Sequence, residues 1–105
     1  MNILLICAAG MSTSLVAANM KKFAEPGTKI NTVAFSESEV ENLIKEYDVV
    51  LVGPQLRYKL NSIKKIAEPL NKPVAVIDAV AYGRLDGKSI YEFAKKIYSE
   101  SIKNS

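Results

Sequence analysis

Four apolar runs divide the 105-residue chain into alternating segments. They are NILLIC (2–7), TKINTVAF (28–35), DVVLVG (48–53) and KPVAVID (72–78). The first, third and fourth are almost continuous in Val, Ile and Leu, which is typical of strands that are covered on both faces. The second alternates apolar and polar residues, a pattern that predicts a strand at the edge of the sheet.

The segments between these runs carry apolar residues at helical spacing. The first predicted helix covers residues 12–24 and ends before the breaker pair Pro26-Gly27. The capping-box pattern Ser36-x-x-Glu39 predicts the start of the second helix. Two further helices are marked by apolar positions, which are Leu56, Leu60, Ile63, Ile66 and Leu70 for the third and Ile90, Phe93, Ala94 and Ile97 for the fourth.

This regular alternation of strands and helices predicts the fold class. We expect a single α/β domain over residues 1–105, with a parallel, doubly wound sheet and right-handed crossovers. In such sheets ligands bind at the carboxyl ends of the strands, near the point where the strand order reverses. The first run ends at Cys7, so this residue is expected at that edge.

The composition excludes several kinds of chemistry. Cys7 is the only cysteine, which rules out an internal disulfide and argues against a Cys-rich metal site. The chain has no histidine, so it cannot build a Ser-His-Asp triad or a Cys-His pair by itself. No metal or organic cofactor is indicated. The net charge of +3 favours an acidic or phosphorylated partner, but no motif indicates nucleic-acid binding.

The sequence also bears on location. No apolar run approaches the roughly 20 residues needed to cross a bilayer. The apolar start has no basic segment before it and runs directly into glycine and hydroxyl residues, unlike a signal peptide. We therefore expect a cytoplasmic protein without direct membrane insertion.

The stretch CAAGMSTS (7–14) carries the candidate chemistry. Its small residues let successive backbone N–H groups converge, and the following helix directs its positive end at the same point. Such a loop can hold a tetrahedral dianion, with the thiol of Cys7 at its base as the nucleophile. The candidate phosphate-binding residues are Ala8, Ala9, Gly10, Met11, Ser12, Thr13 and Ser14. The alternative is that Cys7 is an inert buried residue beside an ordinary turn.

The loop is similar to that of low-molecular-weight tyrosine phosphatases, which read Cys-x5-Arg-Ser/Thr. Six positions after Cys7 this chain has Thr13 instead of arginine. Without the guanidinium, bidentate stabilisation of the transition state is lost, which disfavours rapid ester hydrolysis. Arsenate reductases with a similar loop need further cysteines, and this chain has none besides Cys7. A phosphoryl carrier fits best, and two alternatives stay open: a low-activity phosphatase or reductase, and a regulatory module that binds an anion without covalent chemistry.

The whole chain resembles the IIB component of the bacterial phosphoenolpyruvate-dependent sugar phosphotransferase system, in the lactose/cellobiose/chitobiose group. The resemblance rests on CAAGMSTSLV (7–16), DVVLVGPQLRY (48–58), and KPVAVID followed by YGRLDG (72–87). It implies a four-stranded parallel sheet of order 2-1-3-4 with helices on both faces, as in low-molecular-weight tyrosine phosphatases.

The resemblance also implies a role. Cys7 would accept a phosphoryl group from a phosphohistidine of the IIA component. It would pass that group to a β-linked disaccharide of the cellobiose, chitobiose or lactose type, bound by the membrane IIC component. The chain would thus be a phosphotransferase that contacts the membrane component transiently. Neither the particular disaccharide nor the oligomeric state follows from the sequence.

Residues beyond the loop are candidates for contact with these partners. The set is Gln55, Leu56, Arg57, Tyr58 and Tyr82. We expect one face, around Cys7 and Met11, to meet both partners in turn through shallow, short-lived contacts. Alternatives are a turn role for Gln55, a packing role for Tyr58 and an ordinary surface position for Arg57. Asp86, before Gly87, is expected to be a turn residue or a helix cap.

Overall fold

Four parallel strands form the sheet in the computed structural model, which describes residues 1–8 and 13–103. The strands are β1 (Asn2–Cys7), β2 (Lys29–Ala34), β3 (Val49–Val52) and β4 (Val74–Val76). Their spatial order is β2-β1-β3-β4, and each neighbouring pair is parallel. The four predicted strands, the parallel sheet and the order implied by the family resemblance are therefore confirmed.

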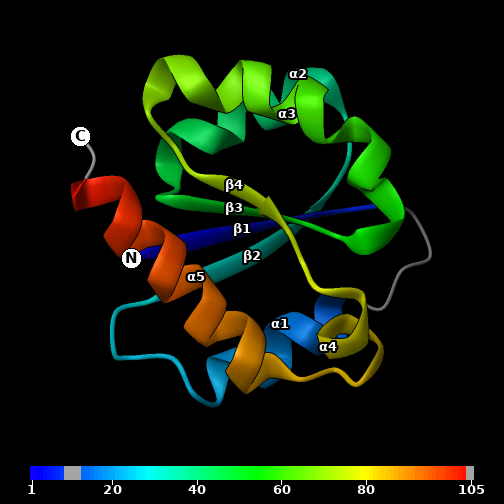
Figure 1. Cartoon of the computed structure of the whole chain (residues 1–105), viewed down its shortest axis with the longest axis vertical. Coiled ribbons are helices and arrows are strands. Elements are labelled where there is room, and N and C mark those ends of the chain that lie inside the picture. The colour runs from blue at the N-terminus through cyan, green and yellow to red at the C-terminus, as the bar shows by residue number, and fades with distance from the viewer. Residues whose placement is uncertain (9–12, 104–105) are drawn as a thin grey trace.

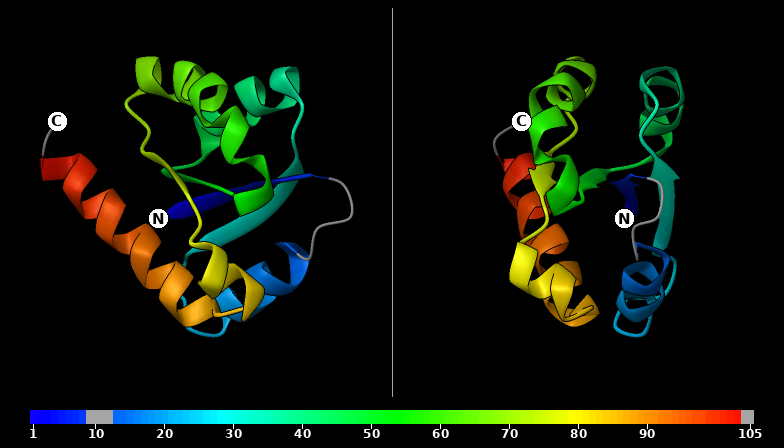
Figure 2. Two further views of the ribbon diagram at one scale, coloured as in Figure 1. Left: turned by 45° about the vertical axis from the view of Figure 1, so that its right-hand side comes forward. Right: turned by 90° about the vertical axis from the view of Figure 1, so that its right-hand side faces the viewer.

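Helices cover both faces of this sheet (Figures 1 and 2). On one face lie α2 (Glu37–Leu43) and α3 (Leu60–Ala67), and on the other lie α1 (Thr13–Lys21), α4 (Ala79–Gly83) and α5 (Gly87–Lys103). The described residues also form three 3-10 segments: η1 (Ile44–Glu46), η2 (Pro54–Lys59) and η3 (Glu68–Leu70). The sequence pattern did not predict α4, because five residues are too few to show a helical period.

Alternate residues of β1 serve two separate cores. Ile3 and Leu5 pack with α1 and α5, whereas Leu4 and Ile6 pack with α2 and α3. All four side chains are fully buried. Burying each contributes about 1.5–3 kcal/mol relative to exposure, and truncating one to Ala would cost about 2–5 kcal/mol. The run at 2–7 is thus continuously apolar because both faces of β1 are covered, as expected.

The edge position of β2 explains its mixed composition. Ile30 is buried and Thr32 and Ala34 are exposed, whereas Asn31 is half-buried and donates a hydrogen bond of 2.7 Å to the hydroxyl of Tyr47. Among the described strands β2 pairs with β1 alone, along a register that joins Asn2 to Lys29 at one end and Cys7 to Ala34 at the other. The expectation of an edge strand is confirmed.

The two predicted caps have different outcomes. Ser36 occupies the N-cap position of α2 with extended backbone, but its side chain makes no capping hydrogen bond; its hydroxyl lies 3.4 Å from that of Ser38. The capping box expected there is therefore not formed. Asp86 does act as a cap, because its carboxylate accepts hydrogen bonds from the backbone N–H and the hydroxyl of Ser89. These bonds hold the pKa of Asp86 below its ordinary value, so acid that protonates it weakens the cap.

The start of α5 lies directly against α1. A Cβ atom placed on Gly87 would collide with the backbone carbonyl carbon of Asn19 and the backbone nitrogen of Met20. Only a residue without a side chain permits this approach. The Asp86-Gly87 turn is consequently a packing requirement between two helices as well as a change of chain direction.

Replacing Gly87 with alanine should force α1 and α5 apart. We expect Gly87→Ala to lower the free energy of unfolding by about 2 kcal/mol or more, since overpacking against backbone has no flexible side chain to absorb it. Urea unfolding followed by circular dichroism measures this. The matched control is Gly83→Ala, because a Cβ there meets no atom within 4 Å. If the two variants were equally stable, the close approach would be refuted.

Candidate functional site

Backbone hydrogen bonds hold the carboxyl end of β1 between the ends of its two neighbours. The carbonyl of Cys7 accepts from the N–H of Phe35 at 2.7 Å, and the carbonyl of Ile6 accepts from the N–H of Gly53 at 2.9 Å. The chain segments after β1, β2 and β3 therefore begin at one edge of the sheet, onto which the right-hand view of Figure 2 looks. Cys7 lies where the connections after β1 and β3 depart to opposite faces, as the doubly wound pattern predicted.

The thiol of Cys7 is neither exposed nor sealed in a core. The side chain has intermediate exposure, and its sulfur donates a weak hydrogen bond of 3.4 Å to the carbonyl of Val33. This contact directs the thiol toward β2, and the residue as a whole is only half-buried. A free thiol in this position can be reached by a reagent or by a partner protein, whereas a structural buried cysteine cannot.

Helix α1 begins six residues after Cys7, with Thr13. Thr13 is 1% exposed, whereas the neighbouring Ser14 is exposed. No acidic residue lies in the first turn of α1, so nothing there offsets the positive end of the helix. Of the predicted loop residues, Ala8, Thr13 and Ser14 are described, and Ala9, Gly10, Met11 and Ser12 lie outside the described residues.

The five candidate contact residues do not share one environment. Gln55, Arg57 and Tyr58 are exposed on η2, which follows β3 at the same sheet edge, and Tyr58 is 73% exposed. Leu56 and Tyr82 are only 4% and 7% exposed, and each belongs to one of the two cores. The expected face is thereby corrected: within η2 the chain turns so that Leu56 packs inward, and α4 turns Tyr82 inward.

Two further residues, Lys59 and Asp78, help to build this edge. Lys59, in η2, places its ammonium 5.5 Å from the centre of the Phe35 ring and 5.8 Å from that of Tyr58. It thereby links η2 to the residue whose N–H binds the Cys7 carbonyl. Asp78 caps α4 by accepting from the N–H of Ala81 at 3.0 Å. An Asp directly after a strand was a visible signal for such a cap, whereas the position of Lys59 depends on tertiary packing.

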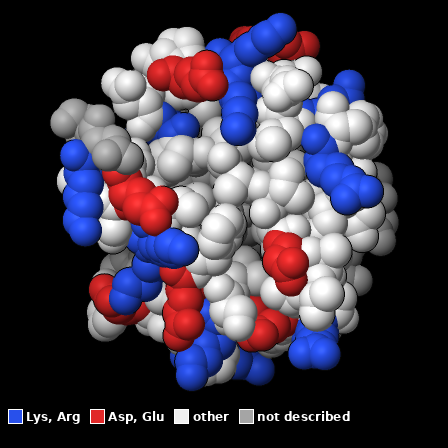
Figure 3. All heavy atoms as spheres, viewed as in Figure 1, with Lys and Arg blue, Asp and Glu red and all other residues white. Residues whose placement is uncertain are grey.

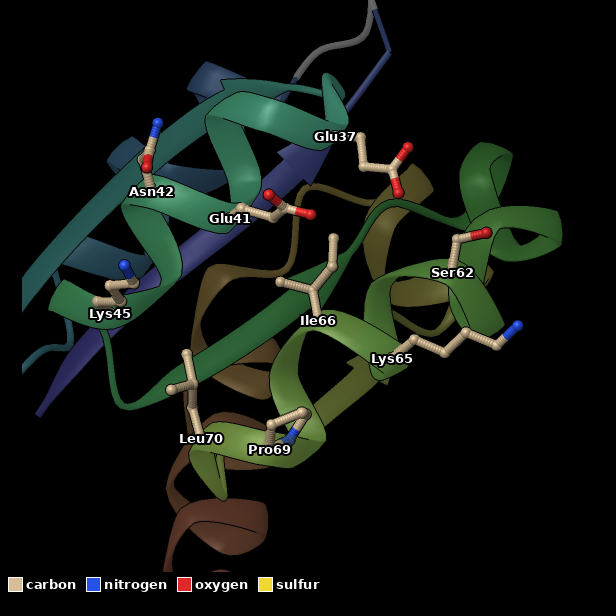
Figure 4. A pocket seen from close by; sticks show the side chains of 9 residues that line it. All are labelled: Glu37, Glu41, Asn42, Lys45, Ser62, Lys65, Ile66, Pro69 and Leu70. Carbon is tan, nitrogen blue, oxygen red and sulfur yellow. The ribbon is translucent and has the colours of Figure 1, made fainter.

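A separate groove of about 550 Å³ runs between α2 and α3 (Figure 4). Its lining combines Glu37 and Glu41 with Lys45 and Lys65, together with apolar side chains such as Ile66. It contains neither Cys7 nor any of the other candidate site residues. The face drawn in Figure 3 likewise mixes both signs of charge around an uncharged centre, unlike the single-sign patch typical of nucleic-acid binding.

Comparison with known proteins agrees with this arrangement. Residues 2–93 match the family described as "PTS system, Lactose/Cellobiose specific IIB subunit", where PTS denotes the phosphotransferase system. The chain belongs to this family. As a IIB subunit it is a phosphotransferase of the sugar phosphotransferase system.

Individual relatives span nearly the whole IIB subunit. This chain is 40% identical over 93 residues to the oligo-beta-mannoside-specific EIIB component of Bacillus subtilis. The match covers 88% of this chain and 90% of that protein. The solution structure of the cellobiose-specific IIB component of Borrelia burgdorferi superposes with a TM-score of 0.73 at 30% identity, covering 96% of this chain and 94% of that one. The family resemblance implied an architecture like that of low-molecular-weight tyrosine phosphatases, and the superposition shows that this chain has the fold of IIB domains.

A third relative bears on the membrane. The IIB subunit is 26% identical over 101 residues to the lactose-specific EIICB component of Staphylococcus epidermidis, covering 93% of this chain and 17% of that protein. In that relative a IIB domain is joined to a IIC membrane component in one chain. Within residues 1–8 and 13–103 of the present chain, no helix is both long enough and apolar enough to span a membrane.

The partly open thiol leads to a simple prediction. Iodoacetamide should modify the folded protein at Cys7 alone, giving one adduct per chain by intact mass, because its sulfur is reachable without unfolding. The Cys7→Ser variant should give no adduct. Modification that appears only after urea has unfolded the chain would show that Cys7 is a closed, structural residue.

Proposed function

We propose that Cys7 is the phosphoryl acceptor of this IIB subunit. The observation that carries the proposal is a free, half-buried cysteine at the carboxyl end of β1, six residues before a helix with no acidic residue in its first turn, in a member of a sugar-phosphotransferase family. The thiolate attacks the phosphorus of a phosphohistidine on the IIA component. The P–N bond breaks, an S–P bond forms, and the histidine takes up a proton. The absence of histidine from the chain agrees with a donor histidine on another protein.

In the second step a sugar hydroxyl attacks the phosphorus of the phosphocysteine. The S–P bond breaks, Cys7 leaves as a thiolate, and the hydroxyl proton passes to a base at the sugar site. We propose that the acceptor is a β-linked disaccharide of the cellobiose, chitobiose or lactose type, bound by the membrane IIC component. Relatives named for oligo-beta-mannoside, cellobiose and lactose support this class. The proposed place of action is the cytoplasmic surface of the membrane, in transient contact with IIC.

The proposed phosphate-binding residues remain those of the loop, Ala8, Ala9, Gly10, Met11, Ser12, Thr13 and Ser14. Backbone N–H groups would hold the phosphoryl oxygens, helped by the positive end of α1. The chain has Thr13 where a phosphatase of similar loop has arginine, so the transition state for attack by water lacks bidentate stabilisation. A phosphocysteine held in this way would react slowly with water and would persist until a sugar acceptor attacks it. We propose further that residues 1–105 act as one IIB domain.

The proposed contact face for IIA and IIC centres on Cys7 and the exposed residues Gln55, Arg57 and Tyr58. Leu56 and Tyr82 support this edge from the interior. Because one thiol must react in turn with a histidine and with a bound sugar, the two partners need overlapping footprints and short-lived contacts. Tyr58 offers an aromatic anchor and Arg57 a charge that can neutralise the phosphoryl group.

Intact mass after incubation with phosphoenolpyruvate, the general phosphotransferase proteins and a cognate IIA tests the acceptor. We expect one added phosphoryl group on the wild-type chain and none on Cys7→Ser, because the chain has no other cysteine. A demonstrably phosphorylated IIA in the same tube is the control. No added mass on the wild-type chain would remove the carrier function. Steady release of phosphate from an aryl phosphate would then favour the phosphatase alternative.

The contact face is tested by truncating its anchor. Tyr58→Ala should lower kcat/KM for phosphoryl transfer from phospho-IIA by about tenfold, the usual effect of losing an interfacial aromatic residue. The matched control is Phe23→Ala, since Phe23 is also an exposed aromatic residue, at 52%, but follows α1 at the far end of the sheet. Chemical-shift mapping with each partner should give footprints that overlap near Cys7; separate footprints would contradict a shared face.

A further inference from the structure

Two buried hydroxyl groups join α4 to the first residue of α1. The Oγ1 atom of Thr13 and the hydroxyl oxygen of Tyr82 lie 3.2 Å apart, and either can be the donor. The two residues are 69 positions apart in the chain and are 1% and 7% exposed. In the right-hand view of Figure 2, α1 and α4 lie side by side under the edge at which β1 ends.

This hydrogen bond is one of several contacts that hold α1 in place. The side chain of Asn19 donates a hydrogen bond of 2.9 Å to the carbonyl of Leu85, a residue held at a positive φ of 54°. Gly87 lies against the backbone of Asn19 and Met20. Three contacts spread along α1 therefore attach it to residues 82–87. The Thr13–Tyr82 pair is the one at the end of α1 that follows the loop of Cys7.

The proposed binding of a phosphoryl oxygen on Cys7 by Thr13 would fix the direction of this hydrogen bond. Phosphoryl oxygens only accept hydrogen bonds, so Thr13 can bind one only by donating its single hydroxyl proton. Thr13 must then accept from Tyr82, which has to be the donor. A phenol that donates to the threonine oxygen both orients that hydroxyl and polarises it, as in other buried hydrogen-bond chains.

We propose that Tyr82 is a positioning residue for phosphoryl transfer: its hydroxyl orients Thr13 and the first turn of α1 toward the phosphoryl group on Cys7. This inference rests on the proposed acceptor role of Cys7. It gives the interior position of Tyr82 a function different from partner contact. It also explains why two hydroxyl groups are buried at a place where a Phe–Val pair would fill similar space.

Tyr82→Phe removes only the hydroxyl and is the direct test. We expect kcat for phosphoryl transfer from phospho-IIA to fall about fivefold, the effect of one hydrogen bond, while KM for phospho-IIA stays within about twofold. The matched control is Tyr91→Phe. Tyr91 is also buried. Its hydroxyl accepts a hydrogen bond from the N–H of Glu25 and lies 3.4 Å from the hydroxyl of Thr28, and both of these residues lie outside the loop region. This control should lower stability without changing kcat.

The double variant Thr13→Val/Tyr82→Phe separates positioning from simple structural support. Because it leaves neither hydroxyl unpaired, it should recover stability relative to Tyr82→Phe. Under the proposal kcat stays low, as in Thr13→Val alone. Recovery of kcat together with stability would overturn the proposal, as would wild-type kcat in Tyr82→Phe or an equal loss in Tyr91→Phe. A wild-type chain that takes up no phosphoryl group would instead refute the acceptor role of Cys7, and this inference with it.

Discussion

Strand β1 is the element on which the remainder of the molecule depends. It is hydrogen-bonded along both edges, to β2 and to β3, and its four central side chains are fully buried in two different cores. A strand held in this way cannot shift its register by one residue, because every buried side chain would move to the opposite face. Its last residue is Cys7, so the position of the thiol follows from the most constrained segment of the protein.

This constraint suits a carrier that must meet two partners. The thiol is presented by a rigid strand end, whereas the exposed groups around it lie on the short segment η2. Lys59 over the Phe35 ring joins that segment to the residue after β2, and the Phe35 N–H in turn binds the Cys7 carbonyl. The result is a thiol in a fixed position beside a surface of exposed polar and aromatic side chains, which favours brief contacts over a permanent interface.

Helix α1 connects this edge of the sheet to α4 and to the start of α5. Its first residue is hydrogen-bonded to Tyr82, and near its other end Asn19 is hydrogen-bonded to Leu85 and lies with Met20 against Gly87. The short helix α4 and the turn into α5 thus act as a platform for the helix that follows the loop. Electrostatics at the loop depend on the direction in which α1 points, and that direction depends on contacts formed far away in the sequence.

The sequence by itself determined the strands, the parallel doubly wound class and the place of Cys7 at a strand end, whereas the strand order came from the family resemblance. Apolar runs and helical spacings are local properties, and the alternation of β and α segments leaves few topologies. The single cysteine, the missing histidine and Thr13 in place of arginine already favoured a carrier over a hydrolase. Ser36 shows the limit of such patterns, since the capping box predicted for it does not form.

Only the tertiary structure decided which side chains face inward at the site. Tyr82 and Leu56 were expected on the surface, yet both are buried, because α4 and η2 orient them toward cores built from distant strands. Helix α4 has too few residues for a readable period, and its capping Asp78 was the sole local signal. The Thr13–Tyr82 pair joins residues 69 positions apart. Local patterns carry no information about such a contact, which exists because α1, α4 and α5 pack on the same face of the sheet.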